Sequence, residues 1–258
     1  MTLSGTTQEN CLTLLERLLP GAEVYHFGIR GAGLREYAAQ LFHEVAEYHP
    51  DLVLVFVSID DDVTRQIPLP DTFDWQGLRL YQMALRLWAD ETPPAAGPVA
   101  ETDDSTCRRD YLRRASSRLA VCRAPIDQPT HEAWNRAQGH LARLIDTCRR
   151  GDMDVALVLL PADFQVNAAL CESMRMRMGY QRCQLDLEIP QRRLREFAAR
   201  QQVAVLDLLP HFRAADAPLY VRHDRHWNTA GNATAARIIG SWLTARYSVQ
   251  PTTIVRAE

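Results

Sequence analysis

The sequence contains no lysine, and its 29 basic residues are all arginine. We interpret this bias as the mark of a GC-rich coding sequence and not as a functional feature. With 32 acidic residues, the formal net charge is −3, so the chain has no overall basic field to attract nucleic acid or an anionic membrane surface. We therefore predict that neither is a partner.

Long apolar runs are also missing. No stretch of about 18 consecutive apolar residues is present, as a transmembrane helix would require. The N-terminus, MTLSGTTQENCLTLLERLL, has neither the positively charged start nor the apolar stretch of a signal peptide. The sequence as given predicts a cytoplasmic location, which an export signal further upstream would change.

The cysteines form no recognisable metal or redox motif. All six are scattered, without a CxxC pair or the spacing of zinc ligands. This favours a reduced compartment and buried or unreactive thiols. A disulfide such as Cys107–Cys122 stays open, without support from the spacing. We predict no metal and no other cofactor.

Strand and helix patterns alternate along most of the chain. Thr6 and Glu9 have the spacing of a capping box ahead of a leucine-rich helix. The segment 52–59 reads LVLVFVSI, a continuous apolar run typical of a strand buried on both faces of a parallel sheet. The other predicted strands are 23–27, 154–160 and 203–208, and the other helices are 34–48, 165–200 with a break at Pro190, and 230–247. This alternation predicts one α/β domain, residues 1–258, with a doubly wound parallel sheet.

The stretch from about 64 to 150 interrupts this alternation. It contains helix-like segments at 75–90, 107–120 and 131–149, and a linker at 92–104 that is rich in proline, alanine and acidic residues. We predict a helical insertion with an exposed linker. Such an insertion could be a lid that selects substrates or a decoration without a role in the site.

Three loops are placed to carry chemistry, because ligands of parallel α/β sheets bind beyond the carboxyl ends of the strands. They are residues 28–33, 59–63 and 220–231. In the third loop, Asp224 and His226 are two residues apart, close enough for the carboxylate to orient the imidazole. His226 could then act as a general base towards a hydroxyl nucleophile.

Other interpretations of these loops stay open. Asp224 and His226 could be ordinary polar residues of a surface loop. A metal site with His223 as a third ligand and His211 as a fourth is less favoured, because ligands so close in sequence rarely converge. The glycines of 28–33 read GxxGxG, which is not the dinucleotide spacing GxGxxG, so nucleotide binding is not predicted.

The third loop resembles the last sequence block of the SGNH (GDSL-type) hydrolases. Its D-x-H-W-N-x-x-G pattern, Asp224 to Gly231, looks like the branch related to polysaccharide acetylesterases and acetyltransferases. Residues 24–33 are similar to the second block, in which a glycine N–H helps to form the oxyanion hole, and residues 49–53 are similar to the entry into the third strand. The resemblance covers most of 6–63 and 150–245.

This resemblance implies a flavodoxin-like sheet and a serine esterase or O-acetyltransferase acting on acyl esters, such as O-acetyl groups of carbohydrates. It assigns His226 as the general base, Asp224 as the residue that orients it, and the N–H of Gly31 as an oxyanion donor. The implied partner is a small-molecule or carbohydrate ester, and the oligomeric state stays open.

The sequence departs from the family pattern at two positions. The Gly-Asp-Ser block with the nucleophile is missing, so the nucleophile is unknown. Ser4 is a candidate because it lies near the expected place, but it lacks the flanking motif and a preceding strand. We therefore expect a chain that begins inside the family domain, lacks its first strand and has exposed sheet edges that lower its stability. The second departure is Asp61, which stands where the family has an oxyanion-hole asparagine.

An ionised carboxylate at position 61 has no hydrogen to donate to an oxyanion. Loss of one such donor costs about 10²–10³ in rate, so we expect impaired catalysis. Alternatively, Asp61 binds a positive group or caps the following turn. The alternative function is a non-catalytic SGNH-like pseudoenzyme that binds a glycan or an acyl chain.

Overall fold

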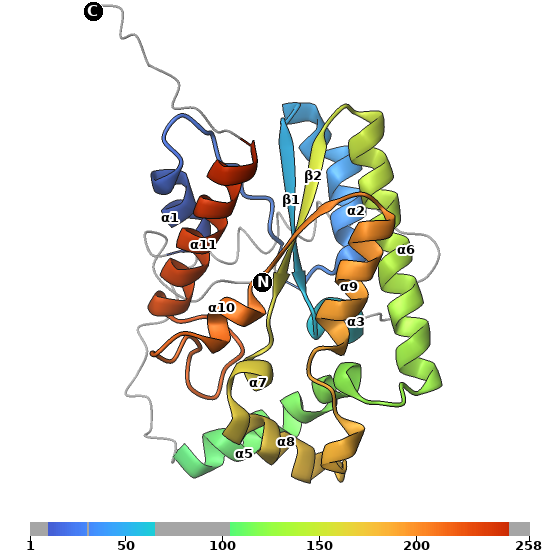
Figure 1. Ribbon diagram of the computed structural model, residues 1–258, viewed down its shortest axis with the longest axis vertical. Helices are drawn as coiled ribbons and strands as arrows, with labels where there is room; N and C mark the ends of the chain where they lie inside the picture. The colour runs from blue at the N-terminus through green and yellow to red at the C-terminus, as the bar shows by residue number, and fades with distance from the viewer. Residues whose placement is uncertain (1–9, 30, 65–103, 248–258) are drawn as a thin grey trace, which may run out of the picture.

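The computed structural model describes residues 10–29, 31–64 and 104–247 (Figure 1). At its centre lies a parallel three-stranded sheet in the order β1-β2-β3. The strands are β1 (Leu52–Ser58), β2 (Asp154–Leu160) and β3 (Ala204–Asp207). They correspond to three of the predicted strands, and with the surrounding helices they confirm an α/β fold of the flavodoxin-like kind.

The helices cover both faces of the sheet (Figure 1). The side chains of β2 show why: Leu157 and Leu159 belong to one buried cluster, whereas Val158 and Leu160 belong to another. The first cluster includes residues of α2 (Leu34–His43), α6 (Gln128–Arg150) and α9 (Ile189–Arg200). The second cluster includes residues of α1 (Cys11–Leu18) and α11 (Thr229–Tyr247). This arrangement confirms the doubly wound architecture.

The predicted strand at 23–27 is wrong, because this segment has no regular secondary structure. A strand needs a neighbour for its backbone hydrogen bonds, and no described strand pairs with this segment. Tyr25 and Phe27 instead each place a ring 5.3 Å from that of Tyr48. A cavity of about 940 Å³ is lined by this segment, by β1 and by α1.

Several helix boundaries differ from the prediction. Asn10 caps α1, since its side chain accepts a hydrogen bond from the N–H of Leu12 at 2.9 Å, while Thr6 and Glu9 lie outside the described residues. Pro190 occupies the first turn of α9, where its missing N–H costs nothing.

The predicted helix at 34–48 divides into α2 and a 3₁₀ turn, Val45–Tyr48. The region 165–200 divides into α7 (Asp163–Val166), α8 (Ala168–Met178), a 3₁₀ turn at Arg182–Gln184, and α9.

The second half of the predicted insertion is helical. It contains α5 (Asp104–Ala115), a 3₁₀ segment, η3 (Ser116–Cys122), and α6. Trp134 and Leu141 of α6 are fully buried in the cluster that includes α2. The predicted helix at 75–90 and residues 92–103 of the linker lie outside the described residues, and the domain boundaries stay a prediction.

The structure also shows the state of the cysteines and the character of the described helices. All six cysteines are free thiols, so Cys107 and Cys122 form no disulfide. Among the described helices, none is long and apolar enough to cross a membrane.

Candidate active site

A pocket of about 240 Å³ lies at the carboxyl end of the sheet. We call it the rim pocket. It is lined by Gly31, Asp61 and His226, three of the residues singled out from the sequence, which come from three separate loops. The other lining residues include Ser58, Asp60, Asp62, Arg118, Asp163 and Arg225. The structure therefore brings the three loops together, while Ser4 lies outside the described residues.

The carboxylate of Asp224 holds the imidazole of His226. Asp224 Oδ1 lies 2.5 Å from Nδ1 of His226 and accepts the backbone N–H of the same residue at 2.9 Å. Partial burial raises the pKa of Asp224, but the backbone N–H and the imidazole outweigh it, so the pKa lies below its ordinary value. An ionised Asp224 accepts the proton on Nδ1 and thereby leaves Nε2 as the basic nitrogen of a half-buried ring that lines the rim pocket.

The residues that follow His226 fix the shape of this loop. Trp227 is buried, and it pairs with Tyr220 in an isolated antiparallel bridge. The side chain of Asn228 donates to the carbonyl of Pro218 at 2.8 Å and accepts the N–H of Gly231 at 2.9 Å. The W-N-x-x-G part of the motif is thus a clasp that closes the loop onto the start of α11.

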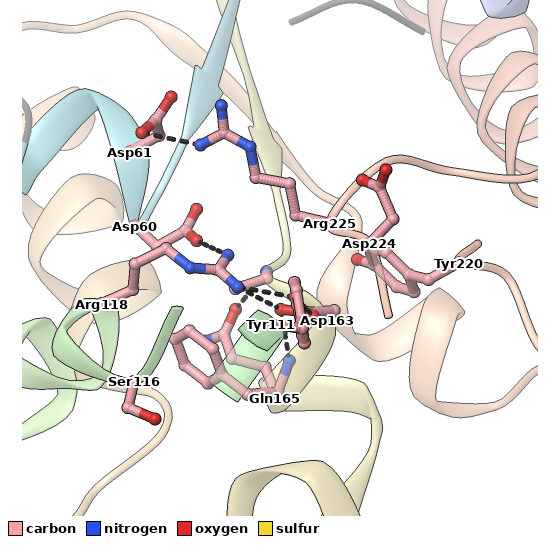
Figure 2. Close-up of polar contacts among 12 residues, drawn as sticks. Asp60, Asp61, Tyr111, Ser116, Arg118, Asp163, Gln165, Tyr220, Asp224 and Arg225 are labelled. Carbon is pink, nitrogen blue, oxygen red and sulfur yellow. Dashed lines mark hydrogen bonds and ion pairs between the residues drawn. The ribbon is translucent and has the colours of Figure 1, made fainter. Parts of the chain in front are cut away.

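Asp61 begins α3 (Asp61–Thr64) and forms an ion pair with Arg225. The distance from Asp61 Oδ1 to Arg225 Nη1 is 2.8 Å. Figure 2 shows the arginine side chain reaching from the Asp224 loop to the loop after β1. Asp61 therefore binds a positive group, one of the alternatives drawn from the sequence.

Sequence reasoning missed a buried ionic network on the floor of the rim pocket (Figure 2). The guanidinium of Arg118 contacts Asp60, lies 3.3 Å from Asp163 and donates to the hydroxyl of Tyr111 at 2.7 Å. Tyr111 in turn donates to Asp163. Arg118 thus joins η3 to the loops after β1 and β2. Burial raises the pKa of Asp163 in spite of the guanidinium, which lowers it.

The residues considered for a metal site are arranged differently. His223 Nε2 lies 2.8 Å from Asp104 at the start of α5, and Arg222 pairs with the same carboxylate. Across the described ranges, no three His, Cys, Asp or Glu side chains are arranged to hold a metal ion.

A protein-family model for the SGNH hydrolase-like domain of the acetyltransferase AlgX matches residues 126–256, just over half of the 258 residues. The chain belongs to this family. Its SGNH hydrolase-like domain includes the Asp224–His226 loop and its clasp, whereas Gly31 and Asp61 precede the matched region. The protein is therefore similar to SGNH hydrolases and O-acetyltransferases. The family suggests a small-molecule or carbohydrate substrate.

Other comparisons add little to this assignment. A search of curated proteins gives no match. A solved crystal structure is similar at 19% sequence identity over 94% of this chain and 89% of the other, with a TM-score of 0.47.

Gly231 belongs to the clasp of this SGNH-like domain, and a substitution at this position tests how closely the clasp is packed. A Cβ at this position would overlap the carbonyl oxygen of Leu219 and lie 2.9 Å from Cβ of Trp227. We expect Gly231→Ala to lower the free energy of unfolding by about 1–3 kcal/mol, because a well-packed site must shift to admit the methyl group. Urea denaturation measures this change.

Gly139→Ala is the matched control, because a Cβ at position 139 of α6 would meet nothing within 4 Å. We expect it to raise the free energy of unfolding by about 0.5–1 kcal/mol, since glycine is a poor residue inside a helix. Equal effects of the two substitutions would contradict the close approach at Gly231.

Asp62, on the wall of the rim pocket, is a buried acid. Its Oδ2 accepts the N–H of Ser58 at 2.7 Å, and burial raises its pKa from 3.8 to about 7, chiefly by removing water from the charged form. The pKa of Asp62 is higher in the folded state than in the unfolded state, so its carboxyl group makes its full contribution to stability below pH 3.8. This contribution is lost as the pH rises through about 7.

We expect Asp62→Asn to remove this pH dependence. Above the folded-state pKa, the variant should be more stable than wild type by about 1–3 kcal/mol, because no buried carboxylate has to ionise. In acid, the two should be nearly equal, since the amide oxygen can still accept the Ser58 N–H. Urea titrations at acidic and alkaline pH measure the difference, with the exposed Asp110→Asn as control. A variant less stable than wild type in alkali would contradict the prediction.

Proposed function

We propose that this protein hydrolyses or transfers acyl groups from esters, with O-acetyl groups on carbohydrates as the substrate class. One observation carries the proposal: an imidazole with Nδ1 bound to a carboxylate lines the same pocket as Gly31. The family's description as an acetyltransferase supports the choice of an acetyl ester.

In this mechanism, His226 Nε2 accepts the proton of a hydroxyl nucleophile while the nucleophile's oxygen bonds to the ester carbonyl carbon. The carbonyl electron pair moves onto its oxygen, towards the N–H of Gly31. Gly31 has a φ of 79°, a left-handed conformation that glycine adopts without strain. When the intermediate collapses, the bond to the alcohol oxygen breaks and that oxygen takes the proton back from Nε2.

A non-catalytic binding protein is the second candidate. The observation that favours it is Asp61, a carboxylate on the rim pocket where the family resemblance expects an amide donor. In this case, the pocket would hold a glycan or an acyl group without cleaving it.

An ester assay on the intact chain separates the two candidates. The probe is p-nitrophenyl acetate, and the readout is release of p-nitrophenolate above the rate in buffer. Saturable turnover that is lost in His226→Ala would support the enzyme. Absence of turnover in acidic, neutral and alkaline buffer alike would contradict it and favour the binding protein.

A further inference from the structure

The ion pair between Asp61 and Arg225 is part of the wall of the rim pocket and is partly shielded from solvent. Both residues line the pocket together with His226 and Gly31. The side chains of Asp61 and Arg225 are 22% and 35% exposed, whereas those of Asp104 and its partner Arg222, from the same loop as Arg225, are 53% and 76% exposed. An exposed pair usually contributes little to stability. The Asp61–Arg225 pair is better shielded and lines the pocket that His226 also lines, so it is the pair to consider for a role in the site.

Arg225 supplies the hydrogen-bond donor that Asp61 lacks. A carboxylate cannot donate a hydrogen bond, but a guanidinium carries five N–H donors in a planar fork. Within the described residues, the ion pair with Asp61 uses Nη1, and the other N–H groups of the guanidinium can donate to a further acceptor. An aspartate at this position therefore fixes a strong donor at the place where the carboxylate itself could only repel charge.

We propose that Arg225, held in place by Asp61, is an oxyanion donor of this site. The inference rests on the proposed acyl-transfer function and names a further catalytic residue for it. As a hydroxyl nucleophile bonds to the carbonyl carbon and its proton passes to His226, the carbonyl pair becomes the lone pair of an oxyanion. Arg225 and the N–H of Gly31 donate to that oxygen until the alcohol leaves with the proton from His226.

Two substitutions decide between this proposal and a simply damaged oxyanion hole. Arg225→Gln should lower kcat for p-nitrophenyl acetate by about 10²–10³-fold with little change in KM, because the donor acts on charge that develops only in the transition state. Arg225→Lys should recover part of this loss, since lysine keeps a charged donor.

Asp61→Asn gives results of opposite sign under the two explanations. If Asp61 holds Arg225, the substitution loosens the donor and lowers kcat. If Asp61 is a damaged asparagine, the amide restores a donor and raises kcat. A rise with Asp61→Asn, together with an unchanged kcat in Arg225→Gln, would overturn the proposal while leaving the esterase function intact.

Arg222→Gln is the matched control, because it removes an exposed arginine from the same loop, and it should leave kcat unchanged. Methylphosphonate, a tetrahedral anion, supplies a readout that needs no turnover. Its affinity, measured by calorimetry, should fall about tenfold or more in Arg225→Gln, the size expected when a charged hydrogen bond is lost, and stay unchanged in Arg222→Gln. Equal affinity in wild type and Arg225→Gln would overturn the proposal, even in a chain that proves inactive on esters.

Discussion

Replacing His226 by alanine is expected to lower kcat for p-nitrophenyl acetate by about 10²–10⁴-fold, the usual contribution of a positioned general base. The imidazole is held by Asp224 through Nδ1, so its Nε2 is the group that would accept the nucleophile's proton. Because this proton moves only during the reaction, KM should change little. Steady-state kinetics of wild type and variant measure both constants.

His223→Ala is the matched control for this substitution. His223 lies three residues earlier on the same loop, but its ring contacts Asp104 instead of Asp224. Activity should survive in this variant. If His226→Ala kept wild-type kcat, or if the two variants lost activity equally, the general base would lie elsewhere.

Replacing Arg118 by leucine is expected to destabilise the fold by about 3–5 kcal/mol, because it leaves buried carboxylates without their shared cation. The side chains of Asp60 and Asp163 are only 5% and 3% exposed. Urea denaturation at neutral pH measures the loss. The loss should shrink in acid, because the raised pKa of Asp163 lets this carboxyl group become neutral before most others.

Arg113→Leu provides the comparison, since Arg113 of α5 is 67% exposed and pairs with Asp110 on the same helix. We expect a change of less than about 1 kcal/mol, as is usual for surface ion pairs. A triple variant, Arg118→Met with Asp60→Asn and Asp163→Asn, should recover part of the stability lost in Arg118→Leu, because the network then contains no charged group. Equal losses in Arg118→Leu and Arg113→Leu would show that the network is effectively solvated.

The parts of the fold that could be predicted are those with a clear pattern of apolar residues over a short stretch of sequence. The run LVLVFVSI and the run DVALVLL each identify a strand, because a parallel sheet buries both faces of its strands. The segment 23–27, EVYHF, is also rich in residues that favour strands but forms no strand. Pairing depends on a neighbour that local pattern does not specify.

The same distinction holds for the candidate site. Asp224 and His226 are two residues apart, so their contact could be inferred from spacing alone. Arg118 lies 58 residues from Asp60 and 45 from Asp163, and nothing distinguishes it from the neighbouring arginines of its segment. The position of Asp163 just after β2 was the available signal, because it places a carboxylate at the sheet edge where the pocket forms.

The contacts of Arg118 and Asp104 have a consequence for how a substrate could enter. Arg118 ties η3 to the floor of the rim pocket, and Asp104, at the other end of α5, contacts His223 of the loop that carries Asp224 and His226. A hinge motion of this segment would have to break a buried guanidinium–carboxylate network, which is costly. We therefore expect η3 to keep its position when a ligand enters the rim pocket, so that the pocket has one fixed size and limits how large an acyl group it can hold.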